Sequence, residues 1–204
     1  MTERIVVYVH GMGGSADEAE HFVPLFLQCE VIGFDYVSST PWEAKEEFGA
    51  FFAGLKEKYK RVTLIANSIG AYFSVASGID RYLDRAYFIS PVADMERLIL
   101  DMLQGSGATE DELREKGVIQ TGFGEDLSWK YLSYVREHPA VWNVQTDILY
   151  GSRDVLIRRE SVDAFVRRNG ARLTVFEGGE HWFHTAEQMR FLDGWIKRGE
   201  EEDG

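Results

Sequence analysis

The chain has 204 residues, of which 45% are hydrophobic and 27% charged, close to the average for soluble globular proteins. This composition excludes a disordered chain or a fibrous repeat, and the length suits one domain, residues 1–204, that folds without disulfide or metal support. The 22 basic and 34 acidic residues give a net charge of −12, which disfavours nucleic acids and anionic membranes as partners. We expect no membrane span and no signal peptide, and the single cysteine, Cys29, favours a cytoplasmic protein.

Short apolar runs rich in β-branched residues alternate with helical patterns along the chain. Several runs are continuously apolar, as in strands that are buried on both faces of a parallel sheet. The pattern predicts strands at about 4–10, 29–35, 61–66, 85–90, 146–150 and 171–176. Helices are predicted at 15–24, about 41–60, 68–77, 160–169 and from 185 onwards. The fold class is therefore α/β, with about six parallel strands and helices on both faces of the sheet.

Four predicted helix starts carry a capping box, in which Ser or Thr is followed three residues later by Glu or Gln. These pairs are Ser15 with Glu18, Thr40 with Glu43, Thr109 with Glu112, and Thr185 with Gln188. A proline at the first helical position, Pro41, strengthens the second of these starts.

Residues 93–145 break the alternation, because they contain no convincing strand. Helices are predicted at about 94–104, 109–116 and 128–138, and the segment is long for a connection between a strand and the next element. It predicts a small helical cap inserted into the single domain. Its aromatic residues are expected to pack the cap onto the core, with Phe123 and Trp129 as candidates to line an apolar acyl pocket.

Three polar residues follow predicted strands, at the edge where open α/β sheets bind their ligands. Ser68 lies in the run Ala66-Asn67-Ser68-Ile69-Gly70, where a sharp strand-to-helix turn needs small residues two before and two after the serine. Asp154 and His181 follow the fifth and sixth strands. A serine hydroxyl needs an adjacent base to become a strong nucleophile, and a carboxylate holds that base in the required tautomer.

At these residues the sequence resembles the α/β-hydrolase fold superfamily, over nearly the whole chain and with the motifs in the family's order. The resemblance implies that Ser68 is the nucleophile, that His181 is the general base and acid, and that Asp154 orients His181. It also implies that the family's two leading antiparallel strands are missing here.

Residues 10–14, His-Gly-Met-Gly-Gly, resemble the loop that follows the family's first parallel strand. By that resemblance the backbone N–H groups of Met12 and Ile69 form the oxyanion hole. His10 is expected to brace this loop. Ala66 departs from the family's commonest motif, which has glycine at that position.

Two positions have alternatives. Asp94, after the fourth strand, could replace Asp154 as the acid, and His184 competes with His181 as the base. His181 and His184 also form a His-x-x-His pair, but no third ligand is evident, so we expect no metal and no organic cofactor.

The function predicted from the sequence is that of a serine hydrolase acting on a small, largely apolar carboxylic ester. The partner is a small-molecule acyl substrate, with no role for nucleic acid or membrane. The alternatives are a thioesterase, a peptidase, a carbon–carbon hydrolase, a lyase or acyltransferase, and a non-catalytic ligand-binding protein.

Overall fold

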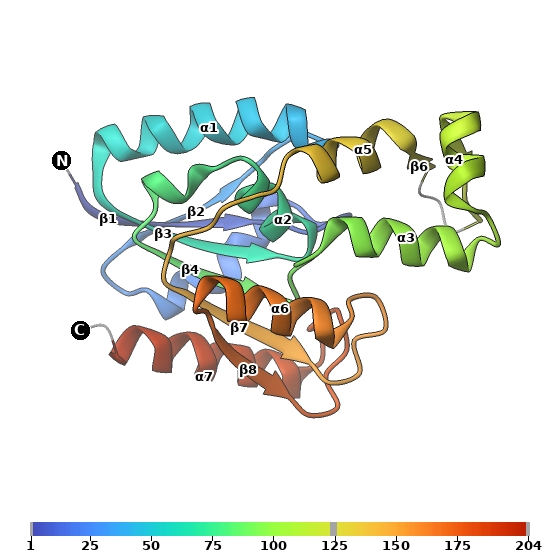
Figure 1. Cartoon of the computed structure of the whole chain (residues 1–204). Coiled ribbons are helices and arrows are strands. Elements are labelled where there is room, and N and C mark those ends of the chain that lie inside the picture. Colours follow the sequence, from blue (N-terminus) through green and yellow to red (C-terminus); the bar gives the residue numbers. More distant parts are fainter. Residues whose placement is uncertain (1, 123–125, 203–204) are drawn as a thin grey trace.

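In the computed structural model, which describes residues 2–122 and 126–202, six strands form one sheet in the order β2-β1-β3-β4-β7-β8 (Figure 1). Every neighbouring pair in this sheet is parallel. The strands are β1 (Thr2–Val9), β2 (Glu30–Phe34), β3 (Tyr59–Asn67), β4 (Arg85–Ile89), β7 (Thr146–Gly151) and β8 (Arg172–Phe176). The predicted six-stranded parallel sheet is confirmed.

Helices cover both faces of this sheet, as predicted (Figure 1). On one face lie α1 (Pro41–Lys58), α2 (Ile69–Ala76), the 3-10 helix η2 (Ile79–Tyr82) and α6 (Arg159–Asn169). On the other lie the 3-10 helix η1 (Ala16–Leu25) and α7 (Ala186–Glu202). Successive side chains of β1 point to opposite faces: Val7 and Val9 belong to the first core, whereas Val6 and Tyr8 belong to the second. Burial on both faces explains the continuously apolar sequence of β1.

The capping boxes formed at three of the four predicted helix starts. Both reciprocal hydrogen bonds are present at Thr40 and at Thr109. In the third box the side-chain oxygen of Gln188 accepts the backbone N–H of Thr185, and the backbone N–H of Gln188 donates to the Thr185 hydroxyl. The box predicted at Ser15 was wrong, because the Ser15 side chain makes no capping hydrogen bond. The carboxylate of Glu18 instead accepts a hydrogen bond from the Tyr8 hydroxyl, a contact across the fold that the local pattern does not encode.

The segment between β4 and β7, residues 93–145, is called the inserted segment below. It contains the predicted helices α3 (Met95–Gly105), α4 (Glu110–Lys116) and α5 (Trp129–Glu137). It also contains a two-stranded antiparallel hairpin, β5 (Val118–Gln120) with β6 (Asp126–Ser128), so the prediction that it has no strand was wrong. Each strand spans only three residues, of which Leu127 alone is buried, so neither leaves a hydrophobic period in the sequence.

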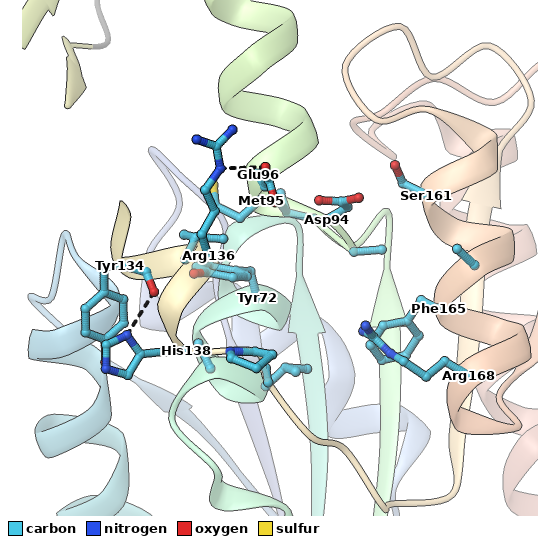
Figure 2. Close-up of a pocket in the computed structure, with 18 residues that line it drawn as sticks. Tyr72, Asp94, Met95, Glu96, Tyr134, Arg136, His138, Ser161, Phe165 and Arg168 are labelled. Atoms are coloured by element: carbon cyan, nitrogen blue, oxygen red, sulfur yellow. Dashed lines mark hydrogen bonds and ion pairs between the residues drawn. The ribbon is translucent and has the colours of Figure 1, made fainter. Parts of the chain in front are cut away.

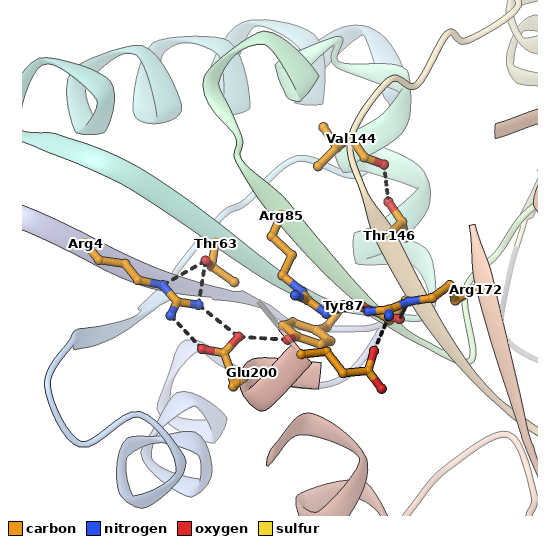
Figure 3. Close-up of polar contacts among 10 residues, drawn as sticks. Arg4, Thr63, Arg85, Tyr87, Val144, Thr146, Arg172 and Glu200 are labelled. Atoms are coloured by element: carbon orange, nitrogen blue, oxygen red, sulfur yellow. Dashed lines mark hydrogen bonds and ion pairs between the residues drawn. The ribbon is translucent and has the colours of Figure 1, made fainter. Parts of the chain in front are cut away.

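Charged groups gather at the amino ends of the strands, away from the edge where the predicted site residues lie (Figure 3). Asp147 accepts from Arg85 at 2.5 Å and from Arg172 at 2.6 Å, and the side chains of Arg85 and Asp147 are almost fully buried. Arg4 pairs with Glu200 of α7 at 2.6 Å. These ion pairs connect strands across the sheet and fasten the C-terminal helix to it.

Candidate active site

The three polar residues predicted from strand ends meet at the carboxyl edge of the sheet. Ser68 follows β3 directly, Asp154 lies in the loop after β7, and His181 lies in the loop after β8. The Ser68 Oγ is 2.8 Å from Nε2 of His181, and Nδ1 of His181 is 2.7 Å from Oδ2 of Asp154. The parallel topology thus brings residues far apart in the chain into one continuous line of hydrogen-bonding contacts.

Asp154 is held rigidly. Its side chain has no exposed surface, and Oδ1 accepts the backbone N–H groups of Leu156 and Ile157, each at 2.9 Å. Because Oδ1 already accepts two N–H groups, the contact at Oδ2 favours the His181 tautomer that carries its proton on Nδ1. Nε2 is then free to accept the proton of the Ser68 hydroxyl.

Ser68 occupies a strained backbone conformation, with φ 51° and ψ −117°. Such a conformation costs a non-glycine residue about 1–3 kcal/mol and is found mainly at functional sites. The surrounding structure fixes it, since the Ser68 N–H donates to the carbonyl of Ile89 at 2.9 Å. The side chain is thereby directed out of the sheet edge toward His181.

Close backbone approach explains the glycine two residues after Ser68. A Cβ placed on Gly70 would lie 2.4 Å from the carbonyl oxygen of His10 and 2.9 Å from atoms of Val9. Only glycine therefore allows the start of α2 to pack against the loop of residues 10–14. Ala66, two residues before Ser68, is fully buried in the core and fits there as a small side chain.

The loop of residues 10–14 is braced from two sides. Its turn is closed by the N–H of Gly14 donating to the carbonyl of Gly11, and the hydroxyl of Tyr36 donates to the carbonyl of His10. The His10 and Tyr36 rings stack with centroids 4.3 Å apart. The loop places Met12 in the wall of the cavity that contains Ser68. Ile69, the other predicted N–H donor, is the first residue of α2, where a helix leaves its N–H groups without intrahelical acceptors.

The loops that carry Asp154 and His181 are joined to each other. The N–H of Arg153 donates to the carbonyl of Gly179 at 2.8 Å. Gly151 lies so close to the second loop that a Cβ on it would be 2.4 Å from that same carbonyl oxygen. This contact fixes the relative position of the carboxylate and the imidazole.

The two alternative residues lie elsewhere. Asp94 caps α3 by accepting the N–H of Arg97 at 2.9 Å, and it lines a separate cavity of about 310 Å³ between α3 and α6 (Figure 2). Nδ1 of His184 lies 2.9 Å from the carbonyl oxygen of Trp182, and the His184 ring stacks on the Trp182 ring. Their contacts favour Asp154 and His181 over Asp94 and His184.

Ser68 and His181 open into a cavity of about 390 Å³. Met12 also lines a neighbouring cavity of about 340 Å³, whose wall comes mainly from the inserted segment. The apolar residues of that wall are Ile69, Met95, Leu98, Ile99, Met102, Leu127 and Tyr131. Met95, Leu98, Ile99, Met102 and Leu127 were not predicted as site residues, although the first four recur at the spacing of one helix face. Among the described residues that line these two cavities, none is Lys or Arg.

The predicted acyl-pocket residues do not form this wall. Trp129 packs against the hydrophobic core and lines neither cavity. Tyr131 occupies the predicted place instead, because two residues along a helix correspond to a rotation of about 200° and so to the opposite face. Phe123 lies outside the described residues. Within residues 2–122 and 126–202, no group of three or more His, Cys, Asp or Glu side chains is placed to hold a metal.

No family model matches the chain, and no curated protein matches it in sequence. Solved structures match it closely in fold. Est1E from Butyrivibrio proteoclasticus superposes with a TM-score of 0.74 at 15% identity, over 98% of this chain and 88% of that one. For mouse α/β hydrolase domain-containing protein 10 the TM-score is 0.77 at 15% identity, over 100% and 92% of the two chains. For Paleococcus ferrophilus monoacylglycerol lipase it is 0.63 at 14% identity, over 97% and 96%. The topology, the strained turn at Ser68 and these matches agree: the chain has the α/β-hydrolase fold.

Proposed function

We propose that this protein is a serine hydrolase that cleaves a small, largely apolar carboxylic ester through an acyl-enzyme on Ser68. The observation that carries the proposal is the continuous line of contacts from Ser68 through His181 to the buried Asp154, at 2.8 and 2.7 Å. The likeness to the monoacylglycerol lipase, whose name denotes ester hydrolysis, supports it.

Ser68 starts the reaction by attacking the ester carbonyl carbon while its hydroxyl proton moves to Nε2 of His181. Asp154 stabilises the imidazolium that forms. The carbonyl oxygen becomes an oxyanion that the N–H groups of Met12 and Ile69 receive, and each such donor contributes roughly 10²–10³ in rate. The imidazolium then gives its proton to the leaving alcohol as the carbon–oxygen bond breaks. A water molecule, deprotonated by His181, then attacks the acyl carbon. The bond to Ser68 Oγ breaks as the imidazolium returns its proton to that oxygen, and the acid is released.

The apolar cavity beside Met12 binds the acyl group of the ester in this proposal. We propose that the inserted segment acts as a cap over the carboxyl edge of the sheet, because it supplies most of that cavity's wall. The absence of Lys and Arg among the described lining residues favours an uncharged acyl group over a carboxylate or phosphate.

Among the described residues, no helix is both long enough and apolar enough to pass through a bilayer. Cys29 is a free thiol. We propose that the enzyme acts in the cytoplasm, where free thiols stay reduced.

Covalent labelling with a fluorophosphonate, read by intact mass, tests the proposal. Wild type and a control variant, Ser161→Ala in the separate cavity between α3 and α6, are expected to gain one label, and Ser68→Ala none. Hydrolysis of p-nitrophenyl esters of increasing chain length then measures how much acyl chain the apolar cavity accepts. Equal labelling of Ser68→Ala, or a folded wild type with neither labelling nor ester turnover, would contradict the assignment.

A further inference from the structure

Besides the apolar cavity beneath the inserted segment, another cavity adjoins the one that contains Ser68, and it lies on the side away from the inserted segment. It has a volume of about 360 Å³ and lies between η1 and the start of α7. Glu18, Asn67 and Trp182 line both this cavity and the cavity of Ser68, so the two spaces meet at these residues. We call the second space the η1 cavity.

The chemistry of ester cleavage assigns the two sides of the site to different parts of a substrate. The leaving group takes its proton from Nε2 of His181, so it lies on the side of that imidazole. Trp182, which follows His181, borders the η1 cavity, whereas Met12 and Ile69 border the apolar cavity. The acyl group therefore extends beneath the inserted segment, and the leaving group extends toward the η1 cavity.

Glu18 places a carboxylate at the junction of the two spaces. It accepts a hydrogen bond from the Tyr8 hydroxyl, which is anchored in the core, and a carboxylate has further acceptor positions free for a ligand. Burial raises the pKa of Tyr8 above its usual value, and the hydrogen bond to Glu18 raises it further, so Tyr8 stays a donor. The position of the Glu18 carboxylate is thus fixed.

Trp182 adds an aromatic surface beside this carboxylate. Its side chain is 67% exposed although it lies beside the catalytic cavity, and the His184 ring stacks on it with centroids 4.4 Å apart. A carboxylate next to an exposed indole, of which His184 covers only one face, is suited to a cation, which is attracted by both the charge and the ring face. No Lys or Arg is among the described residues that line the η1 cavity, and its two histidines, His21 and His184, contact Asp193 and the Trp182 carbonyl oxygen rather than Glu18.

The negative charge of Glu18 is unfavourable for the proposed reaction. Glu18 packs against the loop that carries Met12, since a Cβ on Gly14 would lie 2.7 Å from its Oε1. A negative charge beside this loop opposes the developing oxyanion. A positive charge on the substrate would offset that repulsion.

We propose that the η1 cavity binds the leaving group of the ester, and that this group carries a positive charge, as an amino alcohol does. The inference rests on the proposed hydrolase function. Glu18 and Trp182 are the specificity-determining residues.

A matched pair of esters tests the charge preference. Acetylcholine and 3,3-dimethylbutyl acetate differ in the quaternary nitrogen, which is replaced by carbon in the second. For wild type, kcat/KM is expected to be about tenfold higher for the cationic ester, the size expected for a partly exposed carboxylate and a cation–π contact together. In Glu18→Gln the ratio should fall to near one. Glu20→Gln, a charge-matched control in the same 3-10 helix but outside both cavities, should keep the wild-type ratio.

A binding measurement separates failure of this inference from failure of the proposed function. Choline titrated into folded Ser68→Ala should bind saturably, and Glu18→Gln or the exposed-site variant Trp182→Leu should weaken binding several-fold. Equal kcat/KM for the two esters, or no choline binding, overturns the inference while fluorophosphonate labelling of Ser68 still supports the hydrolase. Choline binding without any labelling or turnover would leave the cation site in place and overturn the hydrolase.

Discussion

Replacing Gly70 by Ala tests whether the turn at Ser68 and the loop of residues 10–14 work as one unit. The added Cβ would lie 2.4 Å from the carbonyl oxygen of His10, whereas ordinary contacts begin at 3.4 Å. The loop must therefore move by about 1 Å, and backbone on both sides prevents a side chain from absorbing the shift. A misplacement of about 1 Å in catalytic groups can cost roughly 10²-fold in rate. We expect kcat for a p-nitrophenyl ester to fall by about that factor.

The matched control is Gly54→Ala in α1, where a Cβ meets no atom within 4 Å. That change should preserve kcat and stabilise the protein by about 0.5–1 kcal/mol, because alanine loses less backbone entropy in a helix. Thermal unfolding and ester kinetics measured on both variants separate loss of folding from loss of geometry. Wild-type kcat in Gly70→Ala, with an unchanged melting temperature, would refute the tight coupling between loop and turn.

Three further predictions concern the acid, the buried ion pair and the inserted segment. Asp154→Asn should lower kcat by about 10⁴ because it favours the wrong imidazole tautomer, while His184→Gln should change kcat little; steady-state ester kinetics compare the two. Asp147→Asn should lower the free energy of unfolding by about 3–5 kcal/mol, measured by urea denaturation, because it removes the carboxylate charge that faces the buried Arg85 guanidinium. The hydrogen bond from Arg136 holds the pKa of Glu110 below its ordinary value of 4.5. This carboxylate is more stable in the folded protein, so its contribution is present above pH 4.5 and is lost as the pH falls below that value. The protection factors of the α4 amides, which are corrected for the slower intrinsic exchange at low pH, should therefore fall on acidification in wild type and less so in Arg136→Gln, and an equal fall in both would count against the pair.

Much of the sheet and the order of the three site residues could be predicted because the signals are local. The continuously apolar run of β1 marks burial on both faces, and the capping box at Thr40 marks the start of α1 within one residue. Ser68, Asp154 and His181 could be predicted to lie close together because each follows a strand directly or within a short loop, and parallel topology brings such positions to one edge. None of these steps needed knowledge of which side chains touch.

The features that were missed depend on contacts between distant segments. Glu18 looked like a capping residue, yet the Tyr8 hydroxyl of β1 holds it at the cavity that contains Ser68. The hairpin of β5 and β6 has no apolar period, and its pairing of Ile119 with Leu127 follows from packing. Whether Trp129 or Tyr131 faces the cavity depends on the rotation of α5, which the composition of the inserted segment does not fix.

The net charge of −12 offers a competing explanation for any preference for cations, because a strongly negative protein attracts them over its whole surface. The two variants Glu18→Gln and Glu20→Gln separate these explanations, since each changes the net charge from −12 to −11. A long-range field responds equally to both and is largely screened beyond about 8 Å at physiological salt. A contact at the junction of the two cavities responds only to Glu18. A preference that disappears in one variant and persists in the other therefore originates at the site, and the acidic surface contributes at most to the rate of encounter.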